Sequence, residues 1–334
     1  MAERRAEARF PEVPAAKGHY ESFYIRAAHP SEPLGVWIRY TVHKRPSSAP
    51  TGSLWFVLFD AAAGAPVASK VTTEELSAPA GEYIRVGQSY FKPGGPGAAA
   101  LAEGSAPSDQ AKPRWRLEVE SEHEPFPYLP ASWMYRAPVP RTKAESPYPA
   151  ATFRGEVEVD GRRIDVDGWR GMVGHNWGSE HAERWIWTQG LLFDGDETAW
   201  FDATLGRIKL GLVTSPWVAN GALFTGGELI RLGGPRRRVE VDERPDGAEF
   251  KIAGKGITVR GQVGSDHDNF VGWVYSDPDG PQHNTVNCSI AEMTLELSRN
   301  GGRAAQLHTA HGAAYELGMR ETDHGIPIQP FPDG

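Results

Sequence analysis

The sequence has little cysteine: a single residue, Cys288, in 334. An internal disulfide framework is therefore excluded, and Cys288 is best interpreted as a small buried residue of a strand. There is no run of about 18 apolar residues, so no membrane-spanning helix is predicted. The charged N-terminus, MAERRAEARF, has no apolar stretch behind it, which argues against a signal peptide. These absences predict a soluble, cytoplasmic protein.

Positive charge is also scarce, because 35 Lys and Arg stand against 43 Asp and Glu, a formal net charge of −8. Without a basic surface, nucleic acid is not an expected partner. No polybasic segment points to anionic lipid. No serine lies in a GxSxG turn, and no glycine-rich phosphate loop joins a strand to a helix. Nucleotide binding and serine hydrolysis are therefore disfavoured, and no cofactor is expected.

Short strand-like segments are frequent, whereas no amphipathic helical pattern of useful length occurs. The segment GVWIRYTVH (35–43) alternates like a strand, and SLWFVLFD (53–60) is apolar on both faces, as in an inner strand. The 38 glycines and 27 prolines suit many strands joined by turns. The pattern predicts an all-β protein with two up-and-down or sandwich-like barrels, which can enclose one small apolar ligand.

Two stretches rich in small residues and proline punctuate the chain, at residues 92–113 and 137–151. The second is the better candidate for a linker between domains. We therefore expect an N-terminal arm over residues 1–20, a first β domain over 21–150 and a second β domain over 151–334.

The segment GMVGHNWGSEHAERWIWTQG, near the middle of the chain, is the most unusual in composition. Glycines on both sides of HNW favour a sharp turn. We expect Trp177 to close a barrel end, and His175 and Asn176 to bind backbone groups or face a cavity. His175, Glu180 and His181 could supply three metal ligands, but their spacing matches no known metal-site pattern, so no metal is expected.

The motif runs into a predicted hairpin over residues 185–205. Residues paired across an antiparallel ladder share a face. One face should therefore carry Trp185, Trp187, Gln189, Leu191, Thr198, Trp200, Asp202 and Thr204. The opposite face is a plain apolar core face. A carboxyl held among aromatic rings has a raised pKa, so Asp202 could act as an acid. Two interpretations stay open: the mixed face lines a ligand cavity, or it is an outer face where Gln189 and Asp202 meet water and the tryptophans lie on the partner domain.

The sequence GHNWGSE followed by WIWTQGLLFDGDETAWF resembles the His-x-Trp-Gly motif and aromatic hairpin of the lipocalin-like carotenoid hydratase family, which includes hydroxyneurosporene synthase and AttH-like proteins. His175, Trp177 and Gly178 map onto that motif. ESFYIRAAHPSEPLGVWIRYTVH and GSLWFVLFD are similar to the opening strands of the family's first domain. The resemblance implies two consecutive lipocalin-like (calycin) antiparallel β-barrels with a ligand cavity near the domain junction.

The same resemblance implies a lipophilic substrate, such as an isoprenoid or polyketide, and cofactor-free protonation of a double bond followed by water capture or cyclisation. In this first hypothesis Asp202 or Glu180 is the acid, and His175 with Asn176 orients the acid or the water. The expected substrate-binding residues are Asn176, Trp177, Trp185, Trp187, Gln189 and Trp200.

A second hypothesis is a carrier that shields a hydrophobic ligand without chemistry. The sequence does not separate the two, but the structure can, because catalysis would place His175 and a carboxyl in one cavity. A glycan-active β-sandwich ranks last, because no pair of carboxyls stands out that could flank a glycosidic bond. The oligomeric state is not indicated.

Overall fold

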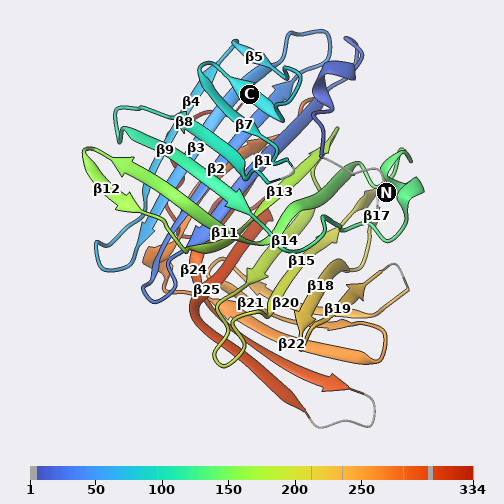
Figure 1. The fold of residues 1–334 in the computed structure, drawn as a ribbon. Coiled ribbons are helices and arrows are strands. Elements are labelled where there is room, and N and C mark those ends of the chain that lie inside the picture. The colour runs from blue at the N-terminus through green and yellow to red at the C-terminus, as the bar shows by residue number, and fades with distance from the viewer. Residues whose placement is uncertain are drawn as a thin grey trace.

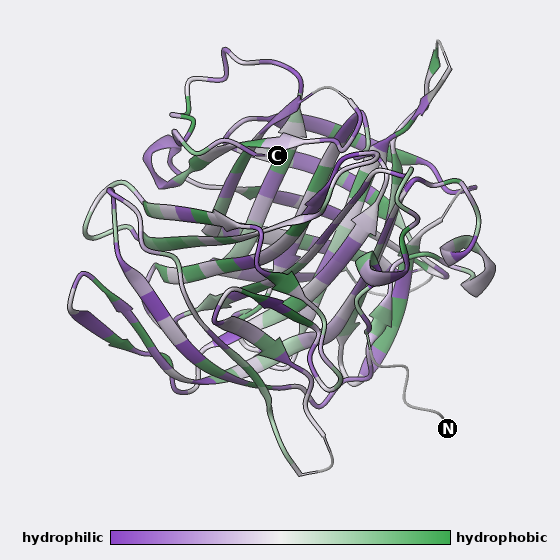
Figure 2. Ribbon diagram, turned by 90° about the horizontal axis from the view of Figure 1, so that it is seen from above, coloured by the Kyte–Doolittle hydropathy of each residue, from purple (hydrophilic) through white to green (hydrophobic). Residues whose placement is uncertain are grey.

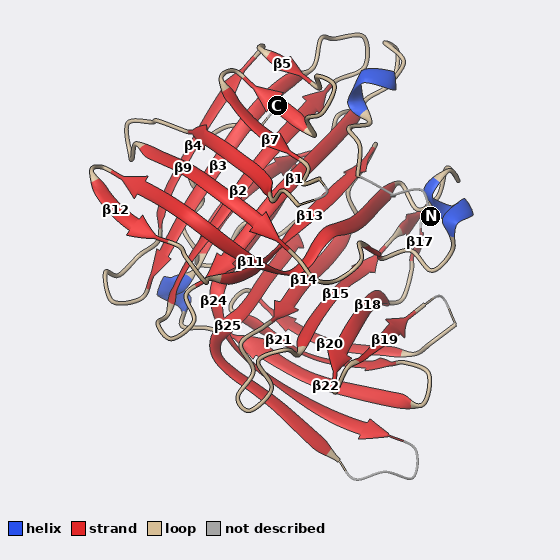
Figure 3. Cartoon of the chain, in the orientation of Figure 1, coloured by secondary structure: helices blue, strands red, loops and turns tan. Residues whose placement is uncertain are grey.

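The computed structural model describes residues 6–95, 97–211, 213–234, 236–280, 282–299 and 304–333. Strands dominate these ranges, and their only helices are three short 3-10 turns (Figure 3). The turns are Phe10–Glu12 (η1), Ser132–Tyr135 (η2) and His267–Asn269 (η3). No helix in the described ranges is long and apolar enough to cross a membrane. The predicted all-β class is confirmed.

The first barrel is one antiparallel sheet in the spatial order β4-β3-β2-β1-β13-β11-β9-β8-β7-β6-β5, with β10 and β12 paired to β11 (Figure 1). Its ends nearly meet, because Gly52 on β3 lies against Leu76 on β5 and Val86 on β6. The strands are β1 (His19–Ala28), β2 (Leu34–Lys44), β3 (Thr51–Asp60), β4 (Val67–Thr73), β5 (Leu76–Ser77), β6 (Ile84–Val86), β7 (Ser89–Lys92), β8 (Ala100–Ser105), β9 (Pro113–Glu120), β10 (Phe126–Pro127), β11 (Thr142–Val159), β12 (Arg162–Asp165) and β13 (Arg170–Gly178).

The second barrel is an antiparallel sheet in the order β19-β18-β15-β14-β25-β24-β22-β21-β20, with β23 paired to β24. An isolated bridge between Leu232 and Gly254 brings its two ends together. The strands are β14 (Arg184–Gly190), β15 (Trp200–Arg207), β18 (Val218–Thr225), β19 (Glu228–Gly233), β20 (Val239–Arg244), β21 (Gly247–Ala253), β22 (Ile257–Gly264), β23 (Val271–Ser276), β24 (Gln282–Arg299) and β25 (Ala305–Met319). A separate small ribbon joins β16 (Lys209–Leu210) and β17 (Val213–Thr214). The expected two-barrel lipocalin-like architecture is confirmed.

Side-chain alternation explains why these segments form barrel walls. In β9, Trp115, Leu117 and Val119 are buried in the first core, while the residues between them are exposed. Figure 2 shows the same alternation of hydropathy along many strands. Burying one face of each strand removes apolar surface from water, which is the main driving force for closing the sheet. Cys288 is buried in the core of the second barrel, as expected.

The change from one sheet to the other lies after β13, and not at residue 150 where the sequence placed the domain boundary. β11 runs through residue 150 and pairs with β13, which carries the HNWG motif and also pairs with β1. The stretch 137–151, expected as a linker, therefore supplies part of a strand in the first sheet. Its prolines, Pro147 and Pro149, fall where the β11–β13 register shifts, and such irregularities tolerate a residue without an N–H.

Candidate functional site

The hairpin β14–β15 has the register predicted from its parity. Trp187 lies opposite Thr204, and Gln189 opposite Asp202. Ile186, on the other face, packs in the core of the second barrel. The mixed aromatic and polar face is turned toward the first barrel, where Gln189 and Asp202 are 1% and 0% exposed. Both interpretations of this face hold in part, because it packs on the first barrel and also lines a cavity.

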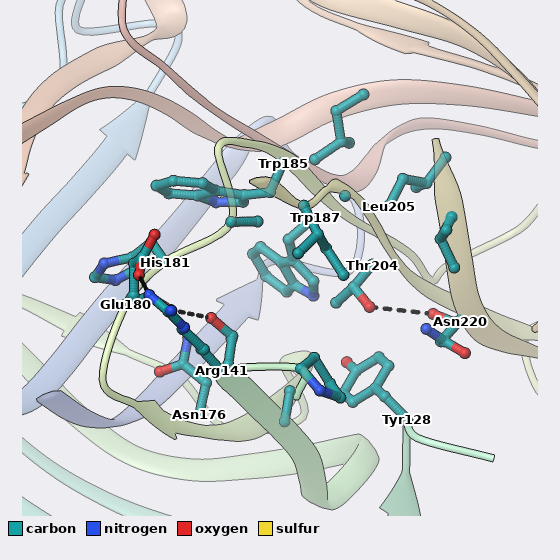
Figure 4. Close-up of a pocket in the computed structure, with 18 of the residues that line it drawn as sticks. Tyr128, Arg141, Asn176, Glu180, His181, Trp185, Trp187, Thr204, Leu205 and Asn220 are labelled. Carbon is teal, nitrogen blue, oxygen red and sulfur yellow. Dashed lines mark hydrogen bonds and ion pairs between the residues drawn. The ribbon is translucent and has the colours of Figure 1, made fainter. Parts of the chain in front are cut away.

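A cavity of about 520 Å³ lies between the two barrels (Figure 4). The first sheet and the second sheet each form a wall, and the segment 128–141 between β10 and β11 covers it. The wall residues of the first sheet include Tyr24, Trp37, Arg39, Thr142 and Asn176. Those of the second sheet include Trp185, Trp187, Thr204, Leu205, Gly206, Val218, Asn220 and Glu316. The covering segment contributes Tyr128, Leu129, Met134, Val139, Pro140 and Arg141.

Asp202 lies directly behind this wall. Its Oδ2 accepts a hydrogen bond from the Tyr128 hydroxyl at 2.6 Å, and its Oδ1 accepts one from the Trp187 indole N–H at 3.2 Å. Burial raises the pKa of Asp202 to about 7, because the two hydrogen bonds that favour the ionised form offset only part of the lost hydration. Tyr128 and Trp187 both face the cavity, so they connect the carboxyl to it.

Tyr24 completes this part of the wall. Its ring lies edge-on to Trp187, with 5.3 Å between ring centroids. It occupies the space above Gly174, where an added Cβ would come within 2.0 Å of Tyr24 Cζ. Burial, and then the nearby Asp202, raise the pKa of Tyr24 well above its usual value. The glycine before His175 therefore makes room for an aromatic side chain of the cavity.

Four of the expected site residues line the cavity: Asn176, Glu180, Trp185 and Trp187. The Glu180 carboxylate forms an ion pair with Arg141 and is about one-third exposed, so it lies at the rim. Trp185 donates its indole N–H to Glu316 Oε1 at 2.9 Å. A fifth expected residue, Asp202, does not line the cavity itself. Its carboxyl is connected to the cavity only through its hydrogen-bond partners, Tyr128 and Trp187.

Three other expected site residues are held in packing contacts outside the cavity. Gln189 Oε1 accepts a hydrogen bond from the buried guanidinium of Arg26 at 3.2 Å. Trp200 donates its indole N–H to His123 at 3.2 Å in a separate aromatic cluster. Trp177 is stacked on Tyr135, with 5.9 Å between ring centroids. The proposal that these three contact a ligand has no support in their surroundings.

His175 points into the first barrel, on the face of β13 opposite to Asn176. It is fully buried, with Nε2 at 2.8 Å from Glu21 Oε1 and Nδ1 at 3.1 Å from Glu145 Oε1. Burial lowers the pKa of His175, but the hydrogen bonds with Glu145 and Glu21 outweigh it, so the net pKa is raised. His175 and Asp202 therefore do not line one cavity.

The carboxylate of Glu21 links His175 to the N-terminal arm. Glu21 also accepts hydrogen bonds from the backbone N–H groups of Arg9 and Phe10 at 2.8–3.0 Å. Burial raises the pKa of Glu21, but its hydrogen bonds with His175 and His19 bring it down to about 2. His175 on β13 thus contacts β1 through Glu21 and β11 through Glu145. This half of the motif therefore has a structural role in the first barrel.

A second polar network lies at another end of the cavity. His181, a cavity residue, has Nδ1 at 2.7 Å from Asp277 Oδ1, and His283 has Nε2 at 3.2 Å from Asp277 Oδ2. In the described ranges this is the only His, Cys, Asp and Glu group that brings three potential ligand atoms within 4.8 Å. His175, Glu180 and His181 do not form such a group. The hydrogen bonds with Asp277 already occupy one nitrogen of each ring.

Comparisons with known proteins agree with this architecture. No family model matches the chain. Two uncharacterised proteins of Mycobacterium tuberculosis, from strains CDC 1551 and H37Rv, are 25% identical over 320 residues, which cover 94% of this chain and 91% of theirs. An AttH-like protein from Nitrosomonas europaea matches with a TM-score of 0.53 at 13% identity, over 96% of this chain and 100% of that one. Kievitone hydratase from Nectria haematococca matches with a TM-score of 0.51 at 9% identity, over 95% and 97%.

The chain has the AttH-like fold. At these identities the likeness establishes the fold alone, so the function has to be argued from the cavity.

Sequence reasoning missed several residues of the cavity wall, and also Asp277 of the network beside it. Tyr128 comes from the segment EPFPYLPASWMY, which has no strand or helix periodicity that would place it. Asp277 lies in a turn after β23, and Glu316 is one of many alternating residues in β25. Arg39 was visible on a predicted strand, but nothing in its own segment shows what its face would meet.

Proposed function

We propose that the chain binds a lipophilic, unsaturated small molecule in the cavity between its barrels and hydrates one of its double bonds. One observation carries this proposal: the fully buried Asp202 carboxyl, with a pKa of about 7, is hydrogen-bonded to a tyrosine hydroxyl in the cavity wall. A carboxyl with a pKa near 7 keeps a large protonated fraction at neutral pH and can then donate a proton.

The walls of the cavity suit a lipophilic ligand. Its volume of about 520 Å³ falls within the range of small-molecule sites, roughly 300–1,000 Å³. Apolar and aromatic side chains supply most of the lining, and ten polar or charged side chains of the described ranges interrupt it. Such a surface binds apolar molecules by excluding water and uses its polar groups to orient them.

The chemistry follows from the bond between Asp202 and Tyr128. When Asp202 carries its proton, it donates to the Tyr128 oxygen, and the Tyr128 hydroxyl is free to donate to the ligand. Tyr128 passes its proton to one alkene carbon and receives the Asp202 proton in the same step. Water then bonds to the other carbon, which carries the positive charge, and the proton that this water loses restores Asp202 through solvent.

The aromatic wall supports the charged intermediate. Tyr24 and Trp187 lie edge-to-face beside Tyr128, and an aromatic face attracts a cation within about 6 Å by roughly 0.5–2 kcal/mol. The fold of kievitone hydratase, which is by its name a hydratase, supports hydration over other reactions of a protonated alkene.

A carrier without chemistry is the second candidate, and the position of His175 favours it. The catalytic hypothesis required His175 and a carboxyl to line one cavity, but His175 is fully buried in the first barrel with two carboxylates as partners. Both candidates require ligand binding in the same cavity, and they differ in whether Asp202 transfers a proton.

Binding is tested by filling the cavity. Gly206 lines it, and the nearest atom to an added Cβ there is Ala182 Cβ at 3.6 Å, so a larger side chain can grow into the space. The neutral dye Nile red should bind the native protein with increased fluorescence, and G206W should weaken this binding at least about tenfold. G95W, at an exposed glycine with no atom within 4 Å of its added Cβ, is the matched control. Equal binding by native protein and G206W would place the dye elsewhere and remove the proposal.

A further inference from the structure

Arg39 is a buried cation on the cavity wall that forms no ion pair with any residue the structure describes. It lies on β2, opposite Tyr24 on β1 and Trp55 on β3, and its side chain faces the second barrel. The residue is only 6% exposed. Its Nε donates to Ser22 Oγ at 2.6 Å, but its two terminal nitrogens have no hydrogen bond or ion pair with any residue of the described ranges. Arginine stays charged in proteins, so Arg39 carries a buried charge without a direct ion-pair partner in the described ranges.

Aromatic rings hold the guanidinium in place. Its central carbon lies 4.3 Å from the centroid of Tyr275 and 5.6 Å from that of Trp55. These contacts fix the direction of the side chain and offset part of the cost of burying the charge. They leave the two terminal nitrogens, a planar pair of donors, without a hydrogen-bond partner in the described ranges, on a residue that lines the cavity.

Carboxylates in the same region are occupied by other donors. Glu316 accepts hydrogen bonds from Trp185 at 2.9 Å and Tyr275 at 3.1 Å. Asp277 is bonded to the rings of His181 and His283. Neither forms an ion pair with Arg39. The carboxylates of Glu316 and Asp277 are therefore not ion-pair partners of Arg39.

We infer that Arg39 binds the carboxylate of a lipophilic carboxylic acid, which places the apolar tail along Trp185, Trp187 and Leu205. The guanidinium fork matches a carboxylate with two parallel hydrogen bonds, and such charge-assisted pairs are the strong ones in a water-poor site. This inference rests on the proposed ligand binding in the cavity and adds a substrate class to it: an unsaturated acid with its carboxylate at Arg39 and its double bond toward Tyr128.

The test uses cis-parinaric acid, a fluorescent polyene fatty acid, and its methyl ester, which has the same tail without the charge. The native protein should bind the acid at least about tenfold more tightly than the ester at pH 8. R39M should bring the two affinities within about twofold by weakening the acid alone. Unchanged binding of the ester shows that the variant is folded. R39K keeps the positive charge but loses the planar pair of donors, so its preference for the acid over the ester should lie between those of native protein and R39M.

Arg141 offers the matched comparison, because it is the other arginine at the cavity and is already paired with Glu180. Loss of the acid preference in R141M with retention in R39M would overturn the assignment to Arg39. The carboxylate inference would be overturned if native protein bound acid and ester equally. It would also be overturned if native protein bound the ester more tightly, because the charges of Asp277 and Glu316 repel the acid. Either result would leave the proposed function standing. Native protein that binds neither probe would overturn both.

Discussion

The Tyr128 hydroxyl, on the segment that covers the cavity, lies 2.6 Å from Oδ2 of Asp202, on a strand of the second barrel. The carboxyl is fully buried, and the tyrosine lines the cavity. This pair connects a buried carboxyl with a raised pKa to the cavity. In the proposed reaction Tyr128 is the route by which the Asp202 proton reaches the ligand.

The protonation state of Asp202 can be measured directly. An infrared difference spectrum between native protein and D202N should contain a protonated carboxyl band that disappears with a midpoint near pH 7. In Y128F the midpoint should rise, because the lost hydrogen bond favoured the ionised form. A band that has already disappeared at pH 5 would show that Asp202 is an ordinary ionised carboxylate.

The raised pKa also makes stability depend on pH. Because the folded pKa of Asp202, about 7, lies above the unfolded value, its contribution is complete below about pH 4 and is lost as pH rises to about 7. The free energy of unfolding of native protein should therefore fall relative to D202N by about 4 kcal/mol over this range. Urea unfolding of both proteins at pH 4 and pH 8 measures the difference, and a constant gap between them would contradict the assignment.

His175 should matter for stability rather than for ligand binding. H175Q removes a buried group bonded to Glu21 and Glu145, and breaking such a pair costs about 3–5 kcal/mol. Since the pKa of His175 is raised, its charged form contributes fully below its unfolded value of about 6.5, and this contribution is lost as pH rises through the folded pKa. The cost of H175Q should therefore be larger at pH 6 than at pH 9.

Nile red binding provides the second readout for His175. Folded H175Q, kept well below its melting temperature, should bind the dye as native protein does, because the imidazole is not part of the cavity wall. If folded H175Q no longer bound Nile red, His175 would have to be part of the binding site.

Gly174 and Gly206 should respond oppositely to the same substitution. A Cβ at position 174 would lie 2.0 Å from Tyr24 Cζ, so G174A has to displace that ring and should cost about 1–3 kcal/mol. At position 206 the nearest atom is 3.6 Å away, so G206A should be tolerated. Thermal unfolding of the two variants checks this contrast. Equal melting temperatures would mean that Tyr24 is not packed on Gly174.

The parts of the fold that depend on residues close together along the chain could be predicted from the sequence. Alternation identified strands such as 35–43, and parity alone placed Gln189 opposite Asp202 across the hairpin. The boundary between sheets was missed because β13 joins the first sheet by pairing with β1, more than 100 residues earlier, and β11 pairs with β13. Composition carries no record of such pairings.

The candidate site shows the same limit. The mixed face of the hairpin was visible, but its partners were not, because Tyr128 is 74 residues from Asp202 along the chain and lies in an irregular segment. The catalytic hypothesis placed His175 in one cavity with a carboxyl such as Asp202, and the sequence alone left this open. Because side chains alternate along β13, His175 and Asn176 point to opposite faces. His175 therefore faces the first barrel, where its ring is hydrogen-bonded to Glu21.

In the proposed reaction the cavity binds a lipophilic molecule, and Asp202 supplies the proton that Tyr128 passes to it. The most direct measurement extracts the molecule that copurifies with D202N, incubates it with native protein or with fresh D202N, and follows its mass. We predict that native protein adds the mass of one water and that D202N returns the molecule unchanged while binding it. Identical masses after both incubations, with binding intact, would contradict the hydratase and leave the carrier.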